Sequence, residues 1–172
     1  MKVYIGRIPA MSREILDSMI NGEHIEVLPE MVNEVELDIS SVLREYVRVE
    51  RDITDRGRDM IADQGLPYNH LFKIKKRLAA ENGFGIGDES IDYLSTQIIE
   101  LMLHTRHVDE VFSEDHEIRK TIRPMLRRHM AMDSELDMEV RNKIKNLQEG
   151  TSDWEIEYKR VMEEEKAKQR LT

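Results

Sequence analysis

The strongest constraint on the fold is a regular apolar pattern between Val32 and Met60, where apolar side chains recur at alternating spacings of three and four residues. A seam sustained over about four heptads is typical of a helix that packs lengthwise against another helix. We therefore expect one helix over about residues 30–62, roughly 50 Å long, which needs a helical partner to cover its seam. The seam consists of Val32, Val35, Ile39, Val42, Tyr46, Val49, Ile53 and Met60, with Arg56 in its one gap.

The sequence also matches itself when it is shifted by 83 residues. The overlay needs no gap over roughly fifty positions, and internal repeats of this kind predict repeated structural units. It extends beyond the seam into the preceding helix, which favours duplication over chance similarity between two heptad-rich helices. Identical pairs include Ser12/Ser95, Ile15/Ile98, Met19/Met102, His24/His107, Ile39/Ile122, Leu43/Leu126, Arg44/Arg127 and Arg58/Arg141. We interpret residues 1–82 and 91–172 as two helical repeats joined by a linker at 83–90.

The second repeat carries its own seam, interrupted by a proline. Pro124 should kink this second long helix, because proline removes a backbone hydrogen bond. The predicted fold is all-α: two three-helix units form a pseudo-twofold bundle, with their long helices packed together. Two separate lobes that dimerise are the alternative, and Lys2–Ile5 is the one stretch compatible with a strand. The second seam reads Ile118, Ile122, Met125, His129, Met132 and Leu136.

Composition excludes several classes of protein. The net charge of −9 argues against a protein that wraps nucleic acid or lies on an anionic membrane, although a local basic patch remains compatible with it. The chain has no cysteine, which excludes disulfides, thiol chemistry and cysteine-type zinc sites. No apolar run approaches the roughly 18 residues of a membrane span, and no secretory signal is recognisable at the start. We expect a cytoplasmic protein.

The end of the chain resembles a known family. The residues that carry the likeness are Asn142 to Lys145, the stretch Glu149 to Lys159 with its Gly-Thr-Ser turn before Trp154, and the glutamate run Glu163 to Glu165. They are similar to the bacterial family catalogued as domain of unknown function 507, over about 90–172 and more weakly over 8–80. The first repeat lacks a tryptophan at the equivalent place. The resemblance implies an α-helical bacterial protein and brings no activity, substrate or cofactor.

Three polar residues at helical spacing could bind a metal. Glu100, His104 and His107 are four and three residues apart, which places them on one helical face. The first repeat has Asp17 and Asn21 in place of the first two, and exposed histidines on an acidic helix are more often simply solvated. We therefore favour a structural role for the recurring His24/His107 pair, bonding a carbonyl or capping a helix.

Other candidate residues are basic or lie in the cores of the seams. Tyr46 and His129 are equivalent seam positions that would touch if the long helices paired antiparallel, and we assign them, with Trp154, to packing.

Two basic clusters could bind phosphates or an acidic partner. For the first of these clusters, the alternative is that its basic side chains form the solvated face of a helix, while Leu71, Phe72 and Ile74 turn inward. The clusters are Lys73, Lys75, Lys76 and Arg77, and Arg119, Arg123 and Arg127 with their neighbours Lys120 and Arg128.

No nucleophile–base set or cofactor loop is recognisable. Gly83–Gly87 lacks the Gly-Lys-Ser/Thr end of a phosphate loop and reads as a linker. We therefore favour a non-enzymatic interaction or scaffold protein, monomeric or homodimeric, with no cofactor, no membrane association and an unidentified protein partner. The alternatives are a nucleic-acid or ribonucleoprotein accessory factor, which ranks second, and a metal-dependent enzyme.

Overall fold

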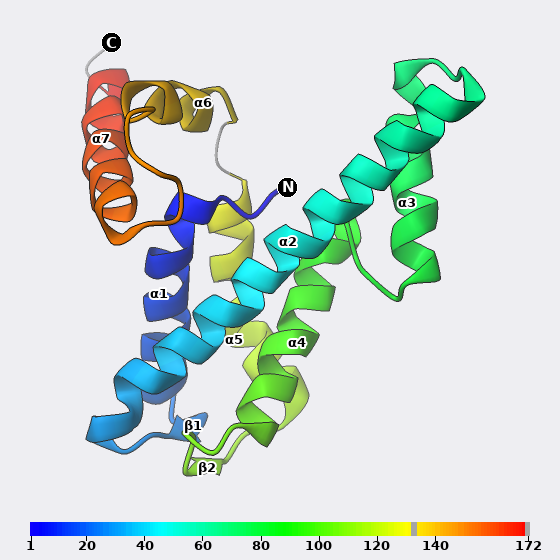
Figure 1. Ribbon diagram of the computed structural model, residues 1–172. Helices are drawn as coiled ribbons and strands as arrows, with labels where there is room; N and C mark the ends of the chain where they lie inside the picture. The colour runs from blue at the N-terminus through cyan, green and yellow to red at the C-terminus, as the bar shows by residue number, and fades with distance from the viewer. Residues whose placement is uncertain (132–133, 171–172) are drawn as a thin grey trace.

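The computed structural model describes residues 1–131 and 134–170 and folds into an all-α bundle, which confirms the predicted fold class (Figure 1). The α-helices are α1 (Ile8–Asn21), α2 (Val32–Gln64), α3 (Leu71–Glu81), α4 (Ser90–His104), α5 (Asp115–Met130), α6 (Ser134–Lys143) and α7 (Ser152–Arg170). Short 3-10 turns η1 (Ile5–Arg7), η2 (Pro29–Met31), η3 (Tyr68–His70) and η4 (Gly87–Glu89) precede α1, α2, α3 and α4. The seam prediction for the first long helix is confirmed, because α2 spans 33 residues without a break.

The centre of the molecule is formed by α1, α2, α4 and α5. Helix α1 packs against both α2 and α5, and α4 does the same. The long helices therefore take opposite corners of the bundle, which differs from the direct pairing that we expected. The reason is the apolar content of the shorter helices: Met11 and Ile15 of α1, and Leu94 and Ile98 of α4, are completely buried between the long ones.

The loops that follow α1 and α4 meet in a small antiparallel ribbon. Strand β1 (Ile25–Glu26) pairs with β2 (Glu110–Val111), with Ile25 opposite Val111. Residues 2–4 form no strand, and Ile5 lies in η1. Both strands follow helices that the 83-residue shift overlays, although the shift places β1 on residues 108–109, just before β2. Residues 83 apart thus lie in α1 and α4, or in α2 and either α5 or α6.

The second long helix is divided in two. Pro124 lies within α5, which continues past it to Met130 before α6 starts at Ser134. The backbone N–H of Lys2 donates to the carbonyl of Met130 over 3.2 Å, so the N-terminal segment takes the place of the next helical turn. Met132, which we counted in the second seam, lies outside the described residues. The break turns α6 away from the axis of α5.

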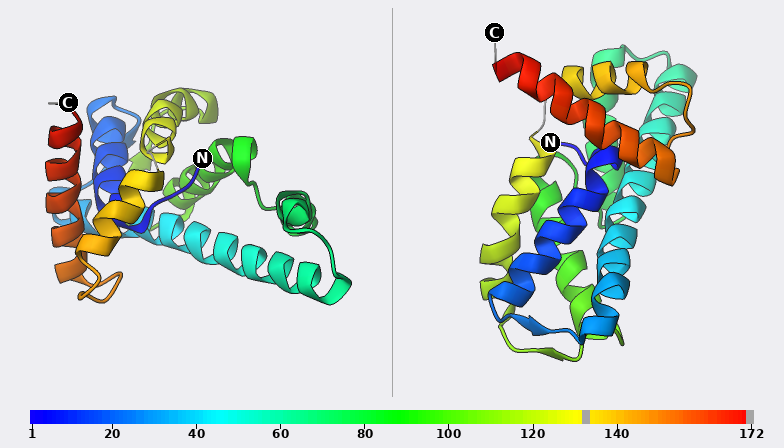
Figure 2. Two further views of the ribbon diagram at one scale, coloured as in Figure 1. Left: turned by 90° about the horizontal axis from the view of Figure 1, so that it is seen from above. Right: turned by 90° about the vertical axis from the view of Figure 1, so that its left-hand side faces the viewer.

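Two appendages extend from the central bundle. The second half of α2 projects beyond it and carries α3 at its side, whereas α6 and α7 pack together at the N-terminal end of α1 (Figure 2). The α6–α7 pair has its own apolar core, which includes Trp154 and Tyr158. It is seated on η1, where Gly6 leaves space for Tyr158: a Cβ at Gly6 would lie 2.1 Å from the tyrosine ring.

Candidate functional site: the groove between α1 and α7

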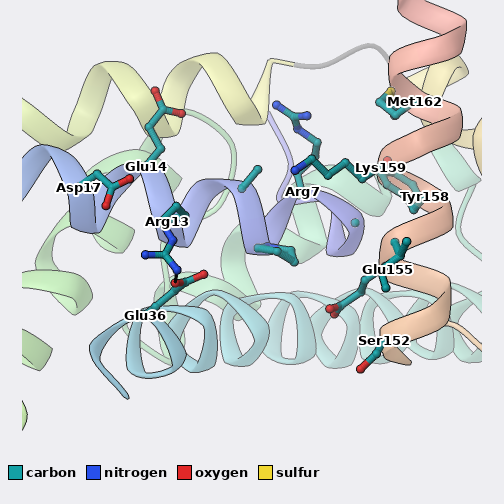
Figure 3. A pocket seen from close by; sticks show the side chains of 14 residues that line it. Arg7, Arg13, Glu14, Asp17, Glu36, Ser152, Glu155, Tyr158, Lys159 and Met162 are labelled. Carbon is teal, nitrogen blue, oxygen red and sulfur yellow. Dashed lines mark ion pairs between the residues drawn. The ribbon is translucent and has the colours of Figure 1, made fainter. Parts of the chain in front are cut away.

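A hollow of the described surface lies where α7 crosses α1, beside the start of α2 (Figure 3). Its volume is about 640 Å³. Short side chains at the beginning of α1 create it: Gly6, Pro9 and Ala10 line the groove and fill little of it. Pro9 suits this place because the first helical turn needs no N–H from it. Concave, largely apolar surfaces of this size are typical of binding sites.

The opposite wall of the groove comes from α7. Met162 and Tyr158 lie deep in this wall and are buried, whereas Ile156 is 65% exposed at its edge. An isoleucine that remains so exposed next to an apolar hollow adds to the surface that a ligand could cover. The groove therefore offers an apolar floor and an apolar rim.

Most charged groups around the groove are already paired. Arg13 binds Glu36 at 2.5 Å, Arg44 binds Glu155, and Glu14 accepts from Arg128. These pairs tie α1 to α2, α2 to α7, and α1 to α5. The paired carboxylates are therefore less free to bind a ligand than the remaining charges.

The charges that remain differ between the two ends of the groove. Lys159 reaches from α7 toward Arg7 at one end, while Asp17 lies on α1 at the other (Figure 3). The Nε atom of Arg7 is buried and has no hydrogen-bond partner among the described residues. A buried donor without a partner is uncommon in folded proteins. Because Nε is not exposed, the positive charges of Arg7 and Lys159, which both line the groove, are what make this end suited to an anionic group.

A buried histidine adjoins the same end of the groove. The Nδ1 atom of His129 lies 2.9 Å from a guanidinium nitrogen of Arg7, and its Nε2 lies 2.6 Å from the carboxylate of Glu14. Because Arg7 can only donate, His129 must accept at Nδ1 and carry its proton on Nε2. Burial, followed by the positive charges of Arg7 and Arg128, lowers the pKa of His129 to about 4. His129 is therefore a neutral link between α5 and α1.

The remaining predicted packing residues lie in separate cores. Tyr46 does not meet His129. Instead it stacks on Phe84 with ring centroids 4.8 Å apart and donates to the carbonyl of Gly85 over 3.0 Å. Trp154 stacks on Tyr158 at 5.0 Å within the α6–α7 pair. The expected antiparallel contact is absent because α1 and α4 lie between the two long helices.

The structure does not bring the three candidate metal ligands together. His104 is turned to the backbone carbonyl of its own Glu100, 2.7 Å away, and both side chains are exposed. His107 binds Asp38 of α2 at 2.7 Å. Within residues 1–131 and 134–170, no group of three or more histidine, aspartate or glutamate side chains is arranged to hold a metal ion.

The two basic clusters lie on different helices and do not merge. In the second, Arg119 donates to Thr96 over 2.9 Å and Arg123 binds Asp92 at 3.1 Å, so both tie α5 to α4, while Arg127 is exposed. The first cluster lies on α3. There Lys75 turns toward Glu50 of α2, 3.9 Å away, while Lys73, Lys76 and Arg77 face solvent.

Sequence reasoning missed the groove itself. Its floor is built from Gly6, Pro9 and Ala10, which carry no chemical signal and matter only because α7 crosses over them. When the shift is increased by one residue, to 84, the overlay extends into the third helices of the two repeats and aligns Ile156 with Phe72. Both prove to be exposed apolar side chains. That shared position was the one available hint of a surface role.

A family model described as "Protein of unknown function (DUF507)" matches residues 1–171. The chain belongs to this family. No curated protein gives a significant match to the DUF507 chain. Among the helices described for it, none is both long and apolar enough to cross a membrane.

Proposed function

We propose that this DUF507 protein is a non-enzymatic interaction module that holds a short amphipathic helix of a partner protein in the groove between α1 and α7. The observation that carries the proposal is the combination of an apolar floor in a groove of about 640 Å³ with the two cationic residues Arg7 and Lys159 at one end. Helix-in-groove recognition uses apolar anchors at helical spacing, with charged residues that set the orientation.

Charge complementarity defines the occupant more closely. A helix lying along α1 from Arg7 to Asp17 would span about three turns at about 1.5 Å per residue. Its acidic end would face Arg7 and Lys159, and its basic end would face Asp17. Two or three apolar side chains between them would fill the floor and contact Ile156. The partner segment is therefore acidic at one end, apolar in the middle and basic at the other end.

A displayed library of twelve-residue peptides tests this proposal. Peptides selected on the intact protein should share that charge order. Ile156→Asp should weaken their binding at least tenfold by placing a charge in the apolar contact, and Lys159→Glu should weaken peptides with an acidic end. The matched control is Phe112→Asp, which alters an exposed apolar residue (55% exposed) near the β-ribbon.

The outcomes separate clearly. Loss of binding in Ile156→Asp but not in Phe112→Asp supports the groove. Equal losses in both variants would assign the peptides to general surface hydrophobicity and reject the proposal. Failure to select any peptide would reject it as well.

The proposal also includes the origin and location of the protein. We propose that residues 1–82 and 91–172 descend from one duplicated unit, which is supported by the matching places of α1 with α4 and of α2 with α5 and α6. The cytoplasm remains the proposed compartment, and the proposed partner is a protein of that compartment.

A further inference from the structure

The outer face of α3 is basic, exposed and remote from the groove. Lys73, Lys76 and Arg77 lie on this face, at the far end of the α2–α3 projection (Figure 1). No acidic residue occurs between Leu66 and Ala80, although the whole chain has a net charge of −9. Such a local excess of positive charge in an acidic protein favours an anionic ligand.

A small hollow opens on this face. Its volume is about 220 Å³, and its lining consists of Gln64, Leu66, His70, Lys73, Ile74 and Arg77. No carboxylate lines it. Arg77 has Glu81 3.8 Å away, whereas Lys73 and Lys76 have no acidic partner among the described residues. Two lysines and a partly paired arginine are therefore available to bind phosphate oxygens.

Helix α7 provides an internal comparison. In the overlay of the third helices, Arg160 takes the place of Lys76, and the places of Lys73 and Ala80 are taken by Glu157 and Glu164. Arg160 binds both of these carboxylates, at 2.7 and 2.5 Å. The same helical face is thus neutralised in α7 and left basic in α3.

An aromatic side chain accompanies the free charges. Phe72 is 59% exposed on the helical turn that carries Lys76, which differs from the alternative interpretation in which it turned inward. Exposed aromatic rings beside cations are the arrangement that binds single-stranded nucleic acid, because bases stack on the rings while phosphates meet the cations. An acidic peptide would use the cations but gain little from the rings.

From these observations we infer that the outer face of α3 binds the phosphate backbone of single-stranded nucleic acid, with Phe72 as a stacking platform for a base. This site is separate from the peptide groove, because none of its residues lines that groove. Either inference can therefore fail without the other.

Fluorescence anisotropy of a labelled twenty-nucleotide single strand, as RNA and as DNA, tests the site with the full chain. The triple variant Lys73→Gln, Lys76→Gln, Arg77→Gln should lose at least tenfold in affinity. With about three phosphate contacts, the logarithm of affinity should fall with the logarithm of salt with a slope of about −2. Phe72→Ala should weaken binding severalfold without changing that slope, because stacking releases no counterions.

A charge-matched control uses Arg106→Gln, Lys120→Gln and Lys145→Gln, three exposed residues outside this face. This control should change affinity less than twofold. Equal weakening by both triple variants, or no binding by the unaltered protein, would overturn the inference. Equal affinity for polyglutamate of similar length would overturn it in favour of an acidic protein partner, and equal affinity for a duplex would overturn the stacking role of Phe72.

Discussion

The Nε2 atom of His24 lies 2.8 Å from the hydroxyl oxygen of Thr121 on α5. Shifted by 83 residues, this contact has a counterpart: His107 binds Asp38 of α2 at 2.7 Å. Each loop histidine therefore reaches the same position on the long helix of the other half. Reciprocal contacts of this kind are what a twofold relation between duplicated units requires, and they explain why a histidine stands at both places.

Making the two contacts identical should stabilise the protein. Thr121→Asp would place a carboxylate beside His24, as Asp38 lies beside His107. Because hydrogen bonds to charged groups are stronger than those between neutral groups, we expect a gain of about 0.5–1 kcal/mol in urea unfolding. An equal gain in the variant that also carries His24→Ala would contradict the assigned contact.

Substituting Gly6 should disturb the seating of α7. Gly6→Ala would place a Cβ 2.1 Å from the ring of Tyr158. Such overpacking should destabilise the protein by about 1–3 kcal/mol, and the fluorescence of Trp154, the single tryptophan, should report the shift.

Gly57→Ala is the matched control for this substitution. Gly57 lies inside α2, where a new Cβ would meet the end of the Leu71 side chain at 3.1 Å and would touch Lys75 and Ile74 at ordinary contact distances of 3.5 and 3.7 Å. Because alanine favours helix over glycine by about 1 kcal/mol, this variant should be neutral or slightly stabilising. Equal destabilisation by both changes would show that Gly6 has no special role.

The neutral His129 should make the protein sensitive to mild acid. Its pKa is about 4 in the folded state and lies near 6.5 when unfolded, so the unfolded chain binds the extra proton between these values. Stability should therefore be unaffected by this group above pH 6.5 and fall as the pH drops toward 4, by roughly 1–3 kcal/mol in total. His129→Gln, whose amide can still accept from Arg7 and donate to Glu14, should lack this loss. Parallel stability curves for the two proteins between pH 6.5 and 4 would refute the assignment.

Two buried tyrosines should differ in their contribution to stability. Tyr158 donates to the carboxylate of Asp137, whereas Tyr46 donates to the neutral carbonyl of Gly85. Burial is the main reason that the pKa of each phenol is raised, so both remain protonated donors at neutral pH. Tyr158→Phe should cost about 1.5–3 kcal/mol and Tyr46→Phe about 1 kcal/mol, because hydrogen bonds to charged groups are the stronger ones. Equal unfolding free energies for the two variants would contradict this ranking.

The helices were more predictable than their packing. Apolar spacing located α2 to within two residues at either end, because a sustained heptad seam has few alternative structures. The same reasoning assigned the seam to the wrong neighbour. An apolar seam predicts that a helix packs against another helix, but it does not identify that helix. Here α1 and α4 pack against α2 because these shorter helices carry enough apolar surface to cover its seam.

The break after α5 illustrates a second limit. Pro124 was the visible irregularity, yet α5 continues past it and ends at Met130, where Lys2 bonds the last carbonyl. No local pattern predicts a contact between residues so far apart in sequence. The groove was unpredictable for the same reason, since it exists only where α7 crosses the small residues of α1. The basic face of α3 was visible in the sequence, but the exposure of Phe72 was not.

The position of α1 affects how the chain can fold during synthesis. This helix is made well before α5, which packs along it, and before α7, which contacts the η1 turn at its start. Until then the fully buried side chains of Met11 and Ile15 have only α2 to cover them. Contacts between distant parts of a chain form slowly and leave apolar surface exposed in the interval. A nascent chain halted before α5 should therefore be a substrate for chaperones, and synthesis of α5 should be the step that covers the second side of α1.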